Sequence, residues 1–394
     1  MKNEKNQQLE SEDILNNNEE IISDAESITD EKIVVFSRDW TIETMVNQID
    51  QGNIDLDPEF QRRNAWKDEK KSKLIESYIL DLPVPEIVLA ENPKKPKAFI
   101  IIDGKQRLLS IIGYINPKKY PYWKDAQLQT LRSRSDLNGI SYQQMNENPK
   151  YTDDVRLLLN SDIRCTVISN FKRNDILYDI FYRLNTGSVP LSTQELRQVL
   201  NKGPFAKYLL DITKELNPLH VAMGLEEPDP RLYDVEFILR FIVFKIFGYE
   251  YTGNLKKFLD EFMGTINDEW DKYKDNVQVI VDSIYCALEN LKLIFDETEI
   301  GRRYSNNKYF PKYNKVILEA QLFYFSKIER KRLTKRKNLN FKKEYEKLCA
   351  NKDFLQAISG STKDIAKYRS RYISMRNIIN STYNLDLTEI IVKE

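Results

Sequence analysis

Cysteine and histidine are both scarce in this sequence of 394 residues, and their scarcity excludes several classes of site. The three cysteines, Cys165, Cys286 and Cys349, lie far apart, so the spacing predicts neither a disulfide framework nor a paired-cysteine metal site. We expect reduced, mostly buried thiols. His220 is alone, and a multi-histidine metal site or an HNH-type nuclease needs more. No cysteine or carboxylate stands at ligand spacing beside His220, which predicts a structural histidine at an element boundary.

Net charge and long apolar runs are also absent. Basic and acidic residues both number 60, so any attraction to nucleic acid must come from a local cluster of charge. The longest apolar run, Phe237–Phe247, is interrupted by Arg240 and Lys245 and falls short of the roughly 20 residues that span a bilayer. The first residues lack the apolar core of a signal peptide. We therefore expect a cytoplasmic protein without membrane contact.

Composition and periodicity divide the chain into three parts. Residues 1–32 hold ten acidic and three basic residues and no aromatic one, which predicts a disordered acidic tail. Residues 33–200 alternate short strands and helices, whereas residues 201–394 carry helical spacing alone. The predicted fold class is therefore α+β, with a small sheet in the N-terminal domain and an all-helical C-terminal domain.

The elements of the first domain follow from caps, turns and apolar spacing. Thr41 is the expected N-cap of a helix through Ile49, and Ser192 or Thr193 is expected to begin a helix through Leu200. Strands are predicted at 32–37 and 163–168, a β-hairpin at 86–90 and 98–102, and helices at 70–80, 108–114 and 174–183. Residues 115–160 read as loops and short helices. The second half predicts helices at 204–213, 234–247, 255–263, 270–295 and 312–331.

The segment Asp103-Gly104-Lys105-Gln106-Arg107 lies between an apolar strand and an apolar helix. A glycine there permits a tight turn, and the N-terminus of the next helix attracts phosphate. Lys105 and Arg107 are suited to phosphate oxygens, Asp103 to a divalent cation or a water, and Gln106 to a base or a nucleophile. The plain alternative is an ordinary turn with solvated charges.

Two further polar clusters accompany this segment. Gln61 and Arg62 repeat the Gln-Arg pair of this segment. The nearby aromatic residues Phe60 and Trp66 are expected either to anchor the apolar core or to stack on a nucleotide base. The third cluster follows the predicted helix at 174–183 and holds Arg183, Asn185 and Thr186. Its alternative interpretation is a helix that ends with a favourable cation.

These motifs together resemble a known family. DPEFQRRNAW, KLIESYILDLPVPEIVLAE, FIIIDGKQRLLSI and FYRLNTGSVPLSTQELR are similar, in order and spacing, to domain-of-unknown-function family 262, the GmrS-like or DGQQR-motif family. The resemblance covers about residues 33–200 and implies a fold related to ParB and sulfiredoxin. RLYDVEFILRF and FLQAISGSTKDIAKYRSRY extend it to stand-alone members.

The resemblance implies nucleotide binding and, in several members, NTP hydrolysis. It carries over to Asp103, Gly104, Gln106 and Arg107, and Lys105 replaces the usual first glutamine. Matching positions in the other two motifs are Gln61, Arg62, Arg183, Asn185 and Thr186. Restriction-type members often add an HNH-like nuclease, which needs a histidine base, and no histidine follows His220. We expect no such nuclease here.

One basic segment, Lys327–Lys343, holds nine basic residues against Glu329. A solvated helix face is the default interpretation, and contact with nucleic-acid phosphates is the alternative. The residues expected to make this contact are Lys331, Arg332, Lys335, Arg336 and Lys337, to which Lys363, Lys367, Arg369 and Arg371 can add.

Three hypotheses follow. The first is an NTP-binding protein of anti-phage or restriction-type defence, with NTP and Mg²⁺ as ligands and Asp103, Gln106 and Arg107 as catalytic residues if NTP is hydrolysed. The second is a non-enzymatic ParB-like module that binds DNA or senses a nucleotide and acts through a separate effector protein. The third is a scaffold with a remnant of the site, which the convergence of Asp103, Arg107, Arg62 and Asn185 in one pocket would argue against.

Overall fold

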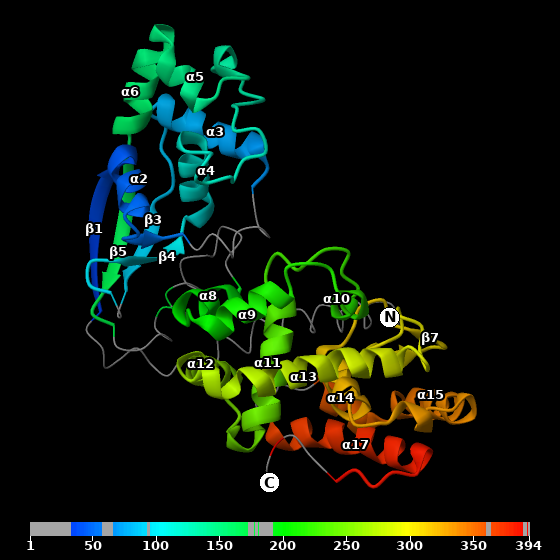
Figure 1. Ribbon diagram of the computed structural model, residues 1–394. Coiled ribbons are helices and arrows are strands. Elements are labelled where there is room, and N and C mark those ends of the chain that lie inside the picture. Colours follow the sequence, from blue (N-terminus) through cyan, green and yellow to red (C-terminus); the bar gives the residue numbers. More distant parts are fainter. Residues whose placement is uncertain are drawn as a thin grey trace. The chain divides into compact units, whose positions relative to one another are not determined.

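The computed structural model describes residues 33–56, 66–92, 95–171, 177, 180, 192–359, 364–388 and 392 (Figure 1). These residues fall into two compact units, one that ends at Val199 and one that begins at Leu200. None of the helices described is long and apolar enough to cross a membrane.

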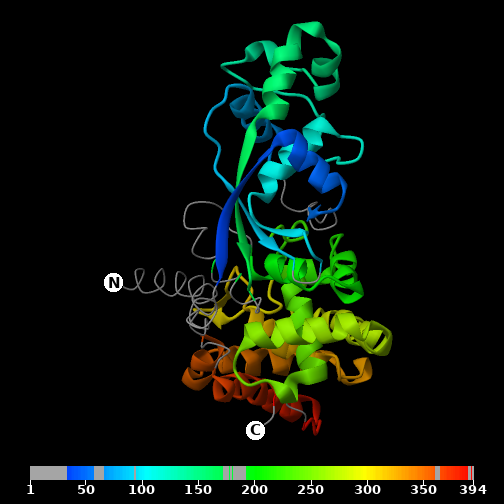
Figure 2. The ribbon, with the colours of Figure 1, turned by 90° about the vertical axis from the view of Figure 1, so that its left-hand side faces the viewer.

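The N-terminal unit contains a mixed five-stranded sheet in the order β1-β5-β3-β4-β2. Its strands are β1 (Val34–Thr41), β2 (Ile54–Asp55), β3 (Ile87–Glu91), β4 (Phe99–Asp103) and β5 (Asp162–Ser169). β3 and β4 form the predicted antiparallel hairpin, and β5 adds to β3 in parallel. β1 pairs antiparallel with β5 along its whole length, as the two long neighbouring ribbons in Figure 2 show. β1 is therefore an edge strand, and its residues Val34, Val35 and Phe36 are exposed.

Helices pack on this sheet around a single apolar core. They are α2 (Ile42–Asp50), α3 (Asp68–Ile79), α4 (Lys105–Ile115), η3 (Ser135–Leu137), α5 (Tyr142–Glu147), η4 (Pro149–Tyr151) and α6 (Thr152–Asn160). A further helix, α8 (Thr193–Leu200), follows later in the chain. The Thr41 side chain caps α2 by accepting from the Thr44 N–H, and Ser192 accepts from the Glu195 N–H at the start of α8. Both predicted caps are confirmed. The core includes Ile75 and Tyr78 of α3, Leu108 of α4 and Leu89 of β3.

The second unit is mostly helical, which confirms the α+β class. Its elements are α9 (Pro204–Ile212), α10 (Pro218–Met223), α11 (Tyr233–Phe247), η5 (Gly248–Glu250), α12 (Leu255–Asp268), α13 (Trp270–Leu291), β6 (Tyr304–Ser305), β7 (Lys308–Tyr309), α14 (Lys315–Phe325), η6 (Arg330–Arg332), α15 (Lys335–Leu348), α16 (Lys352–Ser359) and α17 (Ile365–Tyr383). The small β6–β7 hairpin is an exception to the prediction of helices alone.

Several predicted boundaries differ from those observed, and others lie outside the described residues. The helix predicted at 312–331 is α14, which ends at Phe325 because Asn290 Nδ2 donates to the carbonyls of Phe325 and Ile328 and so satisfies the chain beyond the helix. The helix predicted from Leu108 begins at Lys105. The acidic tail at 1–32 and most of the helix predicted at 174–183 are outside the described residues.

Candidate functional site

A glycine in the left-handed conformation joins β4 to α4. Gly104 has a φ of 93° and is the N-cap residue of α4; residues with side chains adopt this conformation only with strain. A Cβ added to Gly104 would lie 2.8 Å from Cγ1 of Ile87 and 3.0 Å from Nη2 of Arg107. Conformation and packing therefore both require glycine here, and they hold the first turn of α4 against β3.

A β-bulge immediately before this turn redirects Asp103. Leu89 pairs with Ile101, but Val88 pairs with Asp103, so Ile102 is the extra residue of β4. Residues directly opposite one another share a face of the sheet. Asp103 therefore lies on the face of Val88, whereas regular alternation would have placed it on the face of Ile101, which belongs to the apolar core. The bulge keeps the carboxylate out of that core.

The guanidinium of Arg107 forms hydrogen bonds with Asp103 at the end of β4 and with Glu86 just before β3. Its Nη2 donates to Oδ2 of Asp103 at 2.7 Å and to the backbone carbonyl of Glu86 at 3.0 Å. The Arg107 side chain is 11% exposed and that of Asp103 31%. Nε of Arg107 is buried and has no hydrogen-bond partner in the part of the chain that the structure describes. The structure thus brings Asp103 and Arg107 together, with their charges paired with each other.

The charge of Arg107 acts on the buried hydroxyl of Tyr78. Burial raises the pKa of Tyr78 to about 12, and the positive charge of Arg107 acts against that rise. A buried N–H without an acceptor is rare in folded proteins and calls for a specific explanation, such as a bound water or ion. Arg107 Nε is such a group, at the N-terminal end of a helix where the backbone dipoles favour an anion.

The two residues between Gly104 and Arg107 are also held in place. Oε1 of Gln106 accepts the backbone N–H of Trp66 at 3.1 Å, which ties the start of the α3 segment to α4. Trp66 packs partly against the apolar core, and Lys70 Nζ lies 4.0 Å from the centre of its ring. This placement fits the core-anchor interpretation of Trp66. Lys105 is buried at the first position of α4.

Apart from Trp66, the residues of the other two predicted clusters lie outside the described part of the chain. Gln61 and Arg62, with Phe60, lie outside the described residues, and so do Arg183, Asn185 and Thr186. α8, which follows the third cluster, is described and buries an unusual share of polar side chains. Arg197 Nη1 donates to Oε1 of Gln194 at 2.6 Å, and both residues are buried.

The geometry suits a Mg²⁺ ion only together with phosphate oxygens. Among the residues that the structure describes, no group of three or more His, Cys, Asp or Glu side chains is arranged to hold a metal. Asp103 is a single carboxylate at the turn, and its Oδ2 is already bonded to Arg107. Mg²⁺ in nucleotide sites is commonly held by one or two carboxylates plus substrate phosphates and waters. Asp103 fits that role beside a bound nucleotide.

Comparison with known proteins adds one finding that covers strands β2 to β5, the bulge and the turn. Residues 42–200 match the family model of the GmrSD restriction endonuclease, N-terminal domain. The N-terminal unit is thus similar to that domain, which supports the GmrS-like part of the resemblance. A search of curated proteins and a search of solved structures each found no match. The expected relation to ParB and sulfiredoxin stays a prediction.

The basic segment in the second unit occupies η6 and the start of α15. Lys331, Arg332, Lys335 and Arg336 are exposed. Lys331 pairs with Glu329, and both side chains are more than half exposed, so this pair contributes little to stability. Nζ of Lys337 donates to the carbonyl of Tyr383 at 3.2 Å.

One of the residues expected to add to this segment does not. Arg371 is buried in the core of the second unit with 1% of its surface exposed, so it cannot meet nucleic acid. It lies on the face of α17 that also carries the buried Tyr368 and Met375. Lys363 lies outside the described residues.

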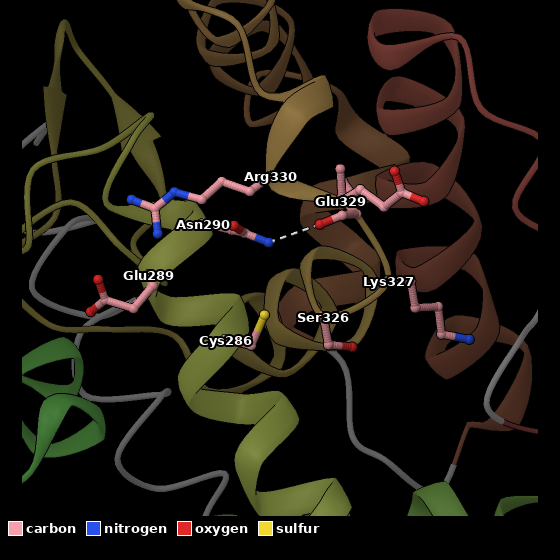
Figure 3. A pocket seen from close by; sticks show the side chains of 8 residues that line it. Cys286, Glu289, Asn290, Ser326, Lys327, Glu329 and Arg330 are labelled. Atoms are coloured by element: carbon pink, nitrogen blue, oxygen red, sulfur yellow. Dashed lines mark hydrogen bonds between the residues drawn. The ribbon is translucent and has the colours of Figure 1, made fainter.

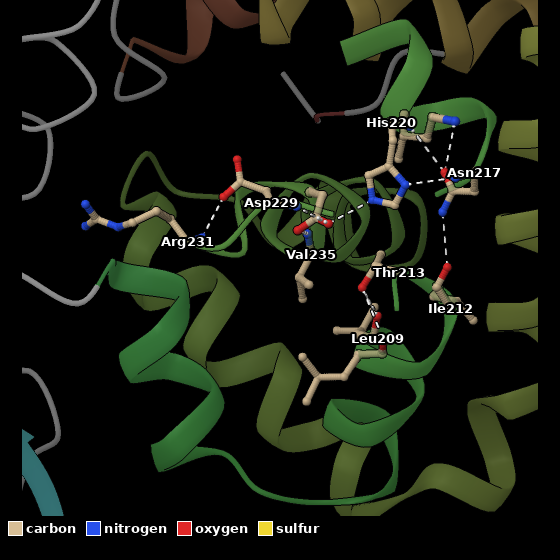
Figure 4. Close-up of polar contacts among 11 residues, drawn as sticks. Leu209, Ile212, Thr213, Asn217, His220, Asp229, Arg231 and Val235 are labelled. Carbon is tan, nitrogen blue, oxygen red and sulfur yellow. Dashed lines mark hydrogen bonds and ion pairs between the residues drawn. The ribbon is translucent and has the colours of Figure 1, made fainter. Parts of the chain in front are cut away.

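The single histidine is structural, as its isolation in the sequence predicted. His220 is fully buried in the first turn of α10, and Nδ1 accepts the backbone N–H of Asn217 at 3.0 Å (Figure 4). Nε2 therefore carries the proton and donates to Oδ2 of Asp234 at 2.8 Å. Asp234 also accepts the backbone N–H groups of Asp229 and Val235. Sequence spacing did not reveal Asp234 as the partner, because the loop before α11 brings it to His220.

A pocket of about 300 Å³ opens in the second unit, where the basic segment begins (Figure 3). Cys286 of α13 and the chain from Ser326 to Arg330 line it. Its Cys286 is exposed, whereas Cys165 and Cys349 are buried, so two of the three thiols are placed as predicted. Charged side chains of both signs, Glu289 and Arg330, lie at its rim, which favours no particular ligand.

Proposed function

We propose that this protein binds a nucleoside triphosphate at the Gly104 turn and acts in prokaryotic anti-phage or restriction-type defence. The observation that carries the proposal is the Arg107 guanidinium, buried at the N-terminus of α4 with an N–H that has no acceptor among the residues that the structure describes. The match of residues 42–200 to a restriction endonuclease domain supports the defence role. A phosphate at this position would meet a helix N-terminus, a glycine that permits close approach and two cationic residues.

Each residue of the turn has a distinct part in this proposal. Nε of Arg107 would contact a phosphate oxygen while Nη2 keeps its bonds to Asp103 and Glu86. Lys105 would add positive charge at the first position of α4. Gln61, Arg62, Arg183, Asn185 and Thr186 would complete the site from outside the described residues. If the nucleotide is hydrolysed, Asp103 would hold Mg²⁺ with the phosphates or orient a water, and Gln106 would help to position that water.

The binding proposal is tested by thermal unfolding in the presence of a panel of NTPs and dNTPs, with and without Mg²⁺. A ligand at 100 times its Kd should stabilise the wild-type protein by about 2.7 kcal/mol. Lys105→Glu should abolish that gain, whereas Lys118→Glu, at an exposed position of the same unit, should retain it. Lys105→Gln restores the usual family residue and should change which nucleotide is preferred. If no nucleotide stabilises the wild type, the proposal is wrong.

Binding and hydrolysis are separated by phosphate release from the same nucleotide. We expect Asp103→Asn to retain binding and lose any turnover, since the amide oxygen can still accept from Arg107 but carries no charge for a cation. A wild type that binds without turnover would support the sensing alternative, in which the nucleotide controls a separate effector protein.

A second function, DNA binding, is favoured by the start of α15. Lys335, Arg336 and Lys337 occupy its first turn, and Thr334 provides no side-chain cap. Cations at a helix N-terminus oppose the helix dipole, so stability alone would favour acidic residues there. Positive side chains added to that end of the dipole make a local field that attracts phosphate.

DNA affinity measured over a range of salt concentrations tests this second function. The double variant Lys335→Glu/Arg336→Glu should weaken binding and reduce the dependence of affinity on salt. The double variant Lys272→Glu/Lys274→Glu changes the charge equally on α13 and should leave both unchanged. Equal affinity of the wild type and the α15 variant would refute DNA contact through this segment.

A further inference from the structure

A buried cation in the second unit has no acceptor among the described residues for most of its donors. Arg371 on α17 has 1% of its surface exposed. Its Nε donates to the carbonyl of Tyr368 at 3.2 Å, and its Cζ lies 4.4 Å from the centre of the Tyr368 ring. Nη1 and Nη2 are buried and have no hydrogen-bond partner among the described residues. Four N–H bonds of a guanidinium that stays protonated therefore point to no acceptor there.

The other charged side chains near Arg371 form an ion pair with each other, so Arg371 has no carboxylate of its own in the described part of the chain. Arg240 of α11 donates to both carboxylate oxygens of Glu319 on α14, at 2.7 and 3.1 Å. This cation–carboxylate pair thus cancels, and Arg371 adds one positive charge. Burial lowers the pKa of Arg371, which shows the same lack of compensation.

Two tyrosine hydroxyls beside Arg371 add a further donor without an acceptor. The hydroxyl oxygens of Tyr368 and Tyr372 lie 3.4 Å apart, and both residues are buried. Burial raises the pKa of each, so both keep their protons. Only one of the two protons can lie between the oxygens. The second hydroxyl proton, like the Arg371 N–H groups, has no acceptor among the described residues.

We propose that this cluster, Arg371 with Tyr368 and Tyr372, binds a small oxyanion of the phosphate or sulfate type inside the helical unit. An oxyanion carries acceptors and negative charge together, which is the combination that the cluster lacks, and it suits the planar fork of arginine. Water would bring donors of its own and no charge. Because Arg371 is almost fully buried, the ion would be small and would exchange slowly. It would bind the second unit, independently of the nucleotide site.

The test compares thermal unfolding of the full chain with and without inorganic phosphate or sulfate. We expect the wild-type Tm to rise with the concentration of the ion and Arg371→Met to lose that rise. In buffer free of oxyanions, Arg371→Met should be at least as stable as the wild type, because an uncompensated buried charge has been removed. Arg376→Met on the same helix is the control, since Arg376 Nη1 already has an acceptor, the carbonyl of Thr388 at 3.0 Å.

These variants also separate specific binding from general salt effects. Sulfate and phosphate stabilise most proteins by exclusion from their surface, and that part should be equal in all three proteins. Arg371→Met that is destabilised equally in every buffer would show a hydrated structural arginine and refute the proposal. If Arg371→Met does not fold, the wild type is equilibrated with phosphate, desalted and denatured. Release of about one phosphate per chain would support the site, and release of none would refute it.

Discussion

Replacement of Gly104 by alanine is the sharpest test of how the candidate nucleotide site is built. Two costs add at this position. The φ of 93° is a left-handed conformation that costs an L-residue about 1–2 kcal/mol. The new Cβ would lie 2.8 Å from Ile87 Cγ1, and overpacking of this kind costs about 1–3 kcal/mol. We therefore expect Gly104→Ala to lower the free energy of unfolding by about 2–5 kcal/mol.

Gly139 supplies a matched control in the same unit. Its φ is 81°, and a Cβ added there would have no atom within 4 Å. Gly139→Ala should therefore cost only the conformational part, about 1–2 kcal/mol. The reduced freedom of the unfolded chain affects both variants alike. The double variant Gly104→Ala/Ile87→Ala should cost less than the sum of its single changes, because Ile87 is the residue that the new Cβ meets.

Urea denaturation followed by tryptophan fluorescence can report on the N-terminal unit alone. Trp40, Trp66 and Trp123 lie in that unit, and Trp270 is the one tryptophan outside it, so the series is measured in a Trp270→Phe background. The reasoning is refuted if Gly104→Ala costs no more than Gly139→Ala. In that case the β4–α4 turn would tolerate a side chain, and close packing against Ile87 of β3 would not be what requires glycine at this position.

Three further predictions concern the second unit and the thiols. A thiol reagent should modify one cysteine in the native protein, Cys286, and three after denaturation, because Cys165 and Cys349 are buried; Cys286→Ser should abolish the native reaction. His220→Gln should lower the free energy of unfolding by about 3 kcal/mol in urea denaturation, because buried Asp234 loses its imidazole donor, whereas Lys367→Ala at an exposed site should change it little. Burial lowers the pKa of Lys245 to about 8 from 10.5, so between these values the unfolded chain binds more protons than the folded one. Lys245 should therefore contribute a rise in the free energy of unfolding between pH 8 and pH 10; Lys327, whose pKa burial also lowers to about 8, adds to it, whereas the buried thiols Cys165 and Cys349, whose pKa values burial raises, oppose it. Lys245→Met should make the slope in this range less positive than that of the wild type, and an unchanged slope would contradict this.

The sequence predicted elements well wherever a local signal was sufficient. Thr41 and Ser192 begin helices as their side chains suggested, and the hairpin of β3 and β4 follows from two apolar runs around a turn. Errors arose where distant residues decide an element's end. α14 ends at Phe325 because Asn290 on α13 donates a hydrogen bond to the Phe325 carbonyl. No feature of the segment 312–331 itself predicts that contact.

The candidate site was only partly predictable. The strand–glycine–helix pattern predicted the position of Gly104, but the bulge at Ile102 and the contact with Ile87 depend on the pairing of β3 with β4, which the sequence does not specify. Arg371 was wrongly assigned to a basic surface. Its spacing from Tyr368 and Met375, three and four residues away, places it on the apolar face of α17, and periodicity would have revealed this had it been applied to the arginine.

The pairing of β1 with β5 has a consequence for the folding of the newly made chain. Val34 pairs with Ser169 and Thr41 with Asp162, so the sheet has a high contact order and cannot close until β5 has left the ribosome. Until then the apolar residues Val34, Val35 and Phe36 have no strand to pair with. Unpaired apolar strand segments of this kind tend to pair with other chains and aggregate. Slow translation of residues 115–160, which separate β4 from β5, would prolong that exposure. Chaperone binding to the nascent N-terminal segment should therefore persist until the chain passes Ser169.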